Sequence, residues 1–252
     1  MQKQYDNIPA VRRSDLWELR KSPMHYIYKV MNPTEPTPAL LFGTAAHKFI
    51  LEPETFWDDY VLVPPDMDRR TNAGKETWAA ILESGKTPIL TADFKTITDM
   101  DAMIKAHPVA AALIKTGEHE VPIEWIDPVT GEPCKCRPDV ITTIDGQDWI
   151  VDYKTTTSCE NGSFERACRA YGYKLQAAMY SDGVFQSSLK TCKFAFVAQE
   201  KSAPYAVRVY KCDQGFIDEG MDLFHDLMDI YHRCKETGEW PGYEDRELVG
   251  DE

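Results

Sequence analysis

Two aspartates and one lysine are residues of the types, and at the spacing, that could form a reactive site. Asp139 follows Arg137-Pro138, and Asp152 and Lys154 come later, directly after the apolar pair Ile150-Val151. Residues two apart in a β-strand point to the same face of the sheet, so we expect Asp152 and Lys154 to lie side by side. Burying these charges is costly unless they are paired or bind a metal. The pattern therefore predicts two carboxylates and a lysine that meet at the end of a hairpin.

This constellation is typical of a metal-assisted reaction. Two carboxylates at one point favour a hard divalent cation with oxygen ligands, which means Mg²⁺ or Mn²⁺. Such a metal lowers the pKa of water and neutralises charge on a phosphate. Lys154 can orient that water or stabilise a pentavalent phosphorane, and the backbone carbonyl of Tyr153 could add a ligand. The predicted chemistry is phosphodiester hydrolysis, and the alternative is a surface hairpin with a cross-strand ion pair.

Further polar residues are candidates for the same site. Gln176 and Tyr180 are four apart, so on a helix they share a face that can bind a phosphate or hold a nucleophile. Glu124 lies in the predicted strand before Asp139 and could add a third carboxylate. His47 follows a run of small residues at the start of a predicted helix. Taken alone, each of these is also typical of a surface, strand or capping position.

The elements that must position these residues begin with helices. A helix over 14–31 is predicted to start with Ser14 as its cap and to be interrupted or restarted at Ser22-Pro23. Three prolines predict a loop over 32–38, and the missing periodicity of 61–75 predicts an exposed loop. Further helices are expected at 43–51, 74–84, 91–106 and 108–115.

From residue 119 the pattern changes to short β-like runs with turn signals between them. Strands are predicted at 120–126, 134–144 and 149–153 as an antiparallel meander, and later at 193–199 and 206–211. Helices are predicted at 163–186 and at 213–237, the second ending at Gly238. The fold class is therefore α+β or mixed α/β, with a helical N-terminal part packed on a sheet. We expect one domain over 1–252, with a helical portion at about 10–115, a core at about 119–240 and an acidic tail at 244–252.

The charge balance excludes a protein with a basic surface overall. The chain has 252 residues and a net charge of −13, from 28 Lys and Arg against 41 Asp and Glu. A DNA enzyme is still compatible with this balance, because only the local field in a cleft or channel acts on the substrate. Two basic segments are candidates for DNA contacts, with solvated surface as the alternative. They are the loop with Arg69, Arg70 and Lys75, and the N-terminal group of Arg12, Arg13, Arg20 and Lys21.

The cysteines and the hydrophobic pattern indicate a cytoplasmic protein. Seven cysteines make an odd number, and Cys134 and Cys136 form a C-x-C pair without any C-x₂-C spacing. Reduced structural thiols are therefore favoured over disulfides or a metal or iron–sulfur site. The N-terminus has no apolar core of a signal peptide, and no run of about 18 apolar residues predicts a membrane helix.

The ordered motifs of this sequence resemble a known family. They resemble the nuclease domain of RecE, in the exonuclease VIII group of phage and prophage enzymes, which belongs to the PD-(D/E)xK nuclease superfamily. The resemblance runs from about residue 14 to Trp240-Pro241-Gly242-Tyr243. The motifs that carry it are Ser14-x-Leu16, Ser22-Pro23-x-His25-Tyr26, Gly43-Thr44-Ala45-x-His47, Arg137-Pro138-Asp139, Asp152-x-Lys154 and Gln176-x-x-x-Tyr180.

The resemblance implies a fold and a set of roles. It implies a restriction-endonuclease-like core with a central mixed β-sheet flanked by helices. By similarity, His47, Asp139, Asp152 and the Tyr153 carbonyl would bind the metal, and Lys154 would be the catalytic lysine. The remaining residues would support the site and the scissile phosphate; they are Gln176 and Tyr180, with Glu124 as a less certain addition.

The resemblance also implies an activity and partners. Family enzymes digest one strand of linear duplex DNA from 5′ to 3′ with Mg²⁺, and they leave a 3′ tail for a single-strand annealing protein of the RecT type. They form ring-shaped tetramers around the DNA. A homotetramer with basic residues in its channel would reconcile a net charge of −13 with DNA binding. The expected setting is the cytoplasm of a bacterial host, with a phage or prophage origin.

Two other functions are compatible with parts of the pattern. One is an endonuclease or a CRISPR-associated nuclease of the same superfamily that holds an iron–sulfur cluster. The cluster is disfavoured because no cysteine precedes Cys134. The other is a catalytically inactive DNA-binding protein, and the presence of Asp139, Asp152 and Lys154 argues against it.

Overall fold

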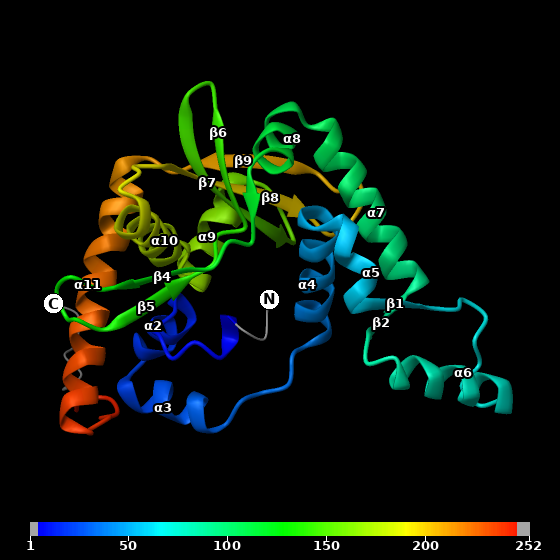
Figure 1. Ribbon diagram of the computed structural model, residues 1–252, viewed down its shortest axis with the longest axis horizontal. Coiled ribbons are helices and arrows are strands. Elements are labelled where there is room, and N and C mark those ends of the chain that lie inside the picture. Colours follow the sequence, from blue (N-terminus) through cyan, green and yellow to red (C-terminus); the bar gives the residue numbers. More distant parts are fainter. Residues whose placement is uncertain (1–4, 246–252) are drawn as a thin grey trace, which may run out of the picture.

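A computed structural model describes residues 5–245 of the chain as a mixed α/β structure around a central sheet (Figure 1). Most of the predicted acidic tail, residues 246–252, lies outside the described residues. The central sheet has five strands in the order β3-β6-β7-β8-β9. Its strands are β3 (Glu118–His119), β6 (Val140–Ile144), β7 (Gln147–Thr156), β8 (Lys193–Glu200) and β9 (Val207–Lys211).

The pairing makes this sheet mixed, as predicted. β7 pairs in parallel with β8, and the other neighbouring strands are antiparallel. A parallel pair needs a crossover connection. Here the connection consists of two helices that cover one face of the sheet, α9 (Asn161–Tyr171) and α10 (Tyr173–Ser188).

Helices cover both faces of the central sheet (Figure 1). On one face, Ile150 and Phe196 pack against α2 (Arg13–Leu19), α9, α10 and α11 (Gln214–Thr237). On the other face, Val151 and Val197 pack with α4 (Pro38–Leu51), α7 (Thr91–Ala106) and α8 (Pro108–Lys115). Neighbouring residues of β7 and β8 thus contribute to two separate cores, as the alternation of side chains along a strand requires.

The predicted meander is confirmed only in part: its neighbouring strands pair antiparallel, but two prolines break the strands and divide the meander into separate hairpins. Pro122 separates β3 from β4 (Ile123–Ile126), and Pro138 separates β5 (Pro133–Cys136) from β6. A proline cannot donate a ladder hydrogen bond, so a central strand ends where it stands. β4 and β5 consequently form a hairpin of their own, to which Val11 adds a parallel bridge at Cys134.

Three helix boundaries also differ from the prediction. Ser14 lies inside the first turn of α2, whose N-cap is Arg12, while Ser22 caps a separate helix, α3 (Pro23–Met31). α4 begins before the predicted residue 43, because Thr37 caps it and Pro38 occupies its first turn. The helix predicted over 163–186 is two helices, and Gly172 between them has a φ of +69°.

Residues 60–90 form a small arm that was not predicted as a unit. The parallel strands β1 (Tyr60–Val63) and β2 (Thr87–Leu90) form its base, and α6 (Asn72–Glu83) lies between them in the chain. Figure 1 shows α6 projecting away from the body of the molecule. Two short elements precede the arm, the 3₁₀ turn η1 (Pro53–Thr55) and α5 (Phe56–Asp59).

Two further predictions concern the whole chain. The seven cysteines are free thiols, so none forms a disulfide. Among the described residues, every helix is too short or too polar to cross a membrane.

Candidate metal centre and active site

The end of the β6–β7 pairing brings the two predicted aspartates together. The last pair of this antiparallel ladder is Val140 with Val151, so Asp139 and Asp152 stand just beyond it. Asp139 was expected inside a strand, but it lies in the bend that precedes β6. Its Oδ2 accepts a hydrogen bond of 2.7 Å from the backbone N–H of Tyr153. β7 extends past the first residue of β6. There the Asp139 side chain, instead of a backbone carbonyl of β6, accepts the hydrogen bond of β7.

Asp152 is held by two side chains that the sequence analysis placed at the site. The Lys154 ammonium donates to both Asp152 oxygens at 2.5 and 2.6 Å, which confirms that the two residues share a face of β7. The Gln176 amide on α10 donates to the same oxygens at 2.9 and 3.1 Å. The Asp152 side chain is only 1% exposed, so these partners supply the compensation that a buried carboxylate needs.

A second group of ligands lies beside this pair. Single ligand atoms of His47, Glu120 and Asp139 all lie within 4.8 Å of one another. His47 comes from α4, and its Nδ1 is 3.6 Å from Asp139 Oδ2. Glu120 follows β3, where its backbone N–H donates to the carbonyl of Asp139 at 3.0 Å and its φ is +52°. The three residues come from three separate elements, and only the tertiary fold brings them together.

Glu120 is the acidic residue that the sequence analysis missed, and Glu124 occupies a different place. Glu124 is on the exposed face of β4, opposite Lys135 of β5, and it does not join the cluster. Pro122 could have indicated Glu120. A strand ends at a proline, so the polar residues near the proline are left where the strand pairing stops. Asp139 beside Pro138 shows the same pattern.

The two remaining predicted residues lie close to this group. Tyr180 is one turn after Gln176 on α10 and is half-buried; burial, followed by the nearby charge of Asp152, raises its pKa well above the usual range. The Tyr153 hydroxyl is turned into the core, where it donates to Gln199 at 2.6 Å. In a strand the N–H and C=O of one residue face the same neighbour, so we expect the Tyr153 carbonyl to face the side of Asp139.

The electrostatics of the cluster favour a bound cation. Burial raises the pKa of Glu120 above its ordinary value, and repulsion from Asp139 raises it further. Burial also raises the pKa of Asp139, followed by repulsion from Asp152. Gln176 Oε1 is buried without a hydrogen-bond partner, which leaves an acceptor beside Asp152. Carboxylate oxygens with one imidazole fit Mg²⁺ or Mn²⁺, so the residues present suit a divalent metal.

The basic residues predicted to contact DNA are spread over two regions. On the arm, the Arg69 guanidinium lies 3.9 Å from the ring centre of Trp78, Arg70 pairs with Asp68 at 2.9 Å, and Lys75 is in α6. Near the N-terminus, two further arginines are bound within the chain. Arg12 pairs with Asp15 at 3.2 Å, and Arg13 donates to the carbonyl of Tyr171 at 3.1 Å.

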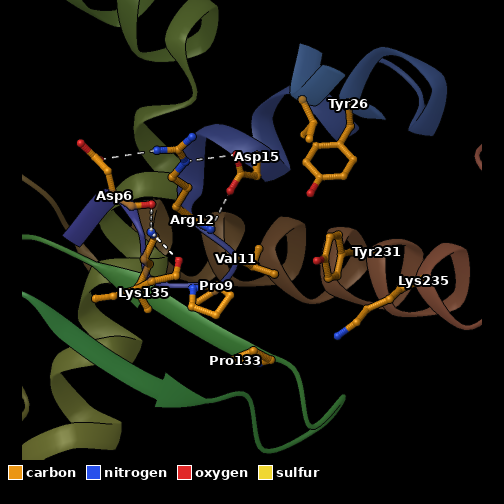
Figure 2. A pocket seen from close by; sticks show the side chains of 13 residues that line it. Asp6, Pro9, Val11, Arg12, Asp15, Tyr26, Pro133, Lys135, Tyr231 and Lys235 are labelled. Carbon is orange, nitrogen blue, oxygen red and sulfur yellow. Dashed lines mark hydrogen bonds and ion pairs between the residues drawn. The ribbon is translucent and has the colours of Figure 1, made fainter. Parts of the chain in front are cut away.

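Two cavities lie elsewhere, on either side of the N-terminal segment. Their volumes are about 390 and 420 Å³, and Pro9, Ala10 and Pro133 line both; Figure 2 shows the first of the two. None of the cluster residues lines either cavity. The chemistry of the donor groups, rather than the size of a cavity, therefore locates the candidate site.

The central mixed sheet, with two aspartates and a lysine at the end of the β6–β7 pairing, defines a PD-(D/E)xK-type fold. The family model described as "PDDEXK-like domain of unknown function (DUF3799)" matches residues 13–249. The chain belongs to this family. This confirms the superfamily that the motifs predicted.

One comparison with a solved structure agrees with this fold. A crystal structure from Eubacterium rectale, described as that of a "Putative exonuclease", has a TM-score of 0.65 and 18% sequence identity. The match covers 98% of this chain and 92% of the other. A structure of SSO0001 has a TM-score of 0.32 and 17% identity, and it covers 73% of this chain and 85% of the other. No curated protein gives a significant match.

Proposed function

We propose that this protein is a divalent-metal-dependent exodeoxyribonuclease that acts from 5′ to 3′ on the ends of linear duplex DNA. The observation that carries the proposal is the convergence of Asp139, Asp152 and Lys154 beside His47 and Glu120, where the β6–β7 pairing ends. The family and the exonuclease-like solved structure support nuclease chemistry. The polarity and the preference for ends rest on the motif resemblance.

The donor groups define how a metal would be held. His47, Glu120, Asp139 and Asp152 would bind Mg²⁺, for which Mn²⁺ can substitute, together with the Tyr153 carbonyl. When bound, the metal neutralises charge on the scissile phosphate and favours deprotonation of water. The cation would then offset the repulsion between the carboxylates, which explains why several carboxylates can lie so close together.

The other residues orient the reacting groups. Lys154 is anchored by Asp152, so its remaining N–H can direct a water or hydrogen-bond a phosphate oxygen. Gln176 holds the Asp152 carboxylate from the other side and fixes its orientation. The Tyr180 hydroxyl has an unusually high pKa and stays protonated, so it is suited to donate a hydrogen bond to the phosphate.

The proposal includes an assembly and a pathway class. A ring-shaped homotetramer would place basic residues in a channel and acidic ones outside, in keeping with the net charge of −13. The 3′ tails would pass to a single-strand annealing protein of the RecT type. The mass in solution tests the ring, because a tetramer has four times the 28.7 kDa of one chain.

The activity is tested with linear duplex DNA labelled at the 5′ or the 3′ end, beside covalently closed circles, with Mg²⁺ or Mn²⁺. We expect early loss of the 5′ label and intact circles. Lys154→Ala should be inactive, and Lys95→Ala, which removes an exposed lysine paired with Asp99, should behave as wild type. Cleavage of closed circles would establish an endonuclease instead. DNA binding without cleavage under either metal would favour an inactive binding protein.

A further inference from the structure

Arg137 lies next to the candidate metal centre, in the loop between β5 and β6 and two residues before Asp139. Its Nε forms an ion pair of 2.7 Å with Glu120 Oε2. The Arg137 side chain is 21% exposed, so it is largely buried but still reaches the surface. A positive charge at this position faces both the metal ligands and the solvent from which a substrate must approach.

The hydrogen-bonding capacity of this guanidinium is not used by the protein. An arginine carries five N–H donors in a planar fork. Among residues 5–245, Arg137 contacts the Glu120 carboxylate as an ion pair and the ring of Tyr5, and its outer nitrogens have no hydrogen-bond partner there. Three largely buried lysines, Lys48, Lys135 and Lys154, donate to carboxylates or to carbonyls. Because the outer nitrogens of Arg137 are not enclosed by the protein, they can donate to an acceptor from outside the chain.

The guanidinium is also held in place by the N-terminal segment. The ring of Tyr5 lies 5.3 Å from the Arg137 guanidinium carbon, as a cation–π contact requires. The Tyr5 and Ile8 carbonyls accept hydrogen bonds of 2.7 and 2.8 Å from the buried Lys135 ammonium. Figure 2 shows Lys135 reaching from its strand to the backbone of this segment. Lys135 and Arg137 are two residues apart, so residues 135–137 both bind the N-terminal segment and carry the Arg137 guanidinium.

We propose that Arg137 is a catalytic residue whose outer nitrogens contact the phosphate undergoing hydrolysis, while its Nε side stays with Glu120. This inference rests on the proposed nuclease function. Guanidinium forks match phosphate oxygens in geometry and charge, and they strengthen as negative charge develops on the phosphate. Tyr5 and Lys135 are then positioning residues that act through Arg137.

The first test compares Arg137→Gln and Arg137→Lys with wild type on linear duplex DNA. Arg137→Gln should lower kcat/KM by about 100-fold, the loss typical of a removed transition-state donor. Arg137→Lys should recover only part of the activity, because an ammonium is a point charge without a fork. Arg233→Gln is the matched control, because it removes an exposed arginine of α11, and it should behave as wild type. Full activity of Arg137→Gln would overturn the proposal.

A second test measures binding without catalysis. The affinity of a fluorescent 5′-phosphorylated duplex oligonucleotide is measured in EDTA at several salt concentrations. Loss of one phosphate contact should make the slope of log K against log salt shallower by about 0.9. Thermal stabilisation by Mg²⁺ alone, without DNA, should persist in Arg137→Gln. An unchanged salt slope together with lost Mg²⁺ stabilisation would overturn the proposal, because Arg137 would then serve only Glu120.

The role of the N-terminal segment is tested at Tyr5. Tyr5→Leu removes the ring and should lower kcat/KM with little change in Mg²⁺ stabilisation, whereas Tyr5→Phe keeps the ring and should restore activity. Equal loss in both variants would contradict the positioning role. If the wild type hydrolyses no DNA with any divalent metal, the proposed function fails, and the salt slope alone then decides whether Arg137 contacts phosphate.

Discussion

At the residue scale, the site is a concentration of negative charge that the chain itself neutralises incompletely. Asp152 has Lys154 and Gln176 as partners. Burial raises the pKa values of both Glu120 and Asp139, and repulsion from a neighbouring carboxylate raises them further: Asp139 acts on Glu120, and Asp152 acts on Asp139. Such a group destabilises the metal-free protein and is suited to a cation, which is the usual relation between stability and function at an active site.

The acidic residues near the metal centre can be separated by mutation. Glu120→Gln should weaken Mg²⁺ binding by at least about tenfold, because it removes a ligand, and activity should fall with it. Glu124→Gln is the matched control, because Glu124 lies on the exposed face of β4. Thermal shift against Mg²⁺ concentration measures the binding. Equal effects of the two substitutions would show that Glu120 is not a ligand.

The raised pKa of Asp139 predicts how stability depends on pH. A carboxyl whose pKa is raised by folding binds more protons in the native state, so its contribution to stability is lost as pH rises past the usual carboxyl range. Metal-free wild type should therefore lose more stability than Asp139→Asn between about pH 4 and about pH 7, because the pKa of Asp139 is raised from the usual carboxyl range to about 6. Mg²⁺ should restore the wild type at the higher pH and leave Asp139→Asn little changed. Parallel curves of Tm against pH would contradict the prediction.

At the element scale, single prolines and glycines decide where strands and helices end, and these ends carry the site. Pro138 ends β5, so that Asp139 can turn beside β7. Gly172 ends α9 in a left-handed conformation, so that α10 can start in a new direction and place Gln176 over Asp152. The site therefore depends on interruptions of regular structure as much as on the elements themselves.

Gly172 offers a test of this dependence. A Cβ at Gly172 would stand 2.4 Å from the ring of Trp17, whereas a Cβ at Gly85 would meet no atom within 4 Å. The two glycines have nearly equal φ, +69° and +68°, so both substitutions by Ala carry the same backbone strain. Gly172→Ala should lower the free energy of unfolding by about 1–3 kcal/mol more than Gly85→Ala. Equal losses in urea unfolding would show that the contact with Trp17 is not restrictive.

At the scale of the whole molecule, an acidic protein whose projecting arm carries exposed arginines can still bind DNA. The net charge of −13 is a sum over the whole chain, and α6 projects from the body with arginines near its start (Figure 1). Arg70 is paired only with the exposed Asp68 on the same loop, and its side chain is 90% exposed. The local field of this arm, rather than the total charge, would act on a DNA backbone.

The arm predicts a defined effect on DNA binding. Replacing Arg69 and Arg70 together by Ala should lower DNA affinity and processivity and make the salt dependence shallower, without a change in Tm. The matched control is Lys95→Ala with Lys105→Ala, which removes two exposed cations that pair with aspartates on α7. Binding and digestion measured at several salt concentrations decide the outcome. Unchanged digestion by the arginine variant would exclude the arm from the DNA path.

The sequence by itself determined the chemistry and much of the secondary structure. The helical spacing of apolar residues and the residues at the helix ends predicted the bounds of α7, α8 and α11 closely. The spacing of Asp152 and Lys154 predicted their contact, because two residues that alternate on one strand share a face whatever surrounds it. These features are local, so the chain encodes them over a few residues.

Only the tertiary structure decided which distant residues join this local pair. Glu120 follows a short strand and has ordinary neighbours in the sequence, and the fold places it beside His47 and Asp139. Glu124 looked equally suitable, but its strand pairs with β5 outside the central sheet. Which of two nearby carboxylates reaches the site depends on strand pairing and on where a proline interrupts it, and pairing is a property of the folded chain as a whole.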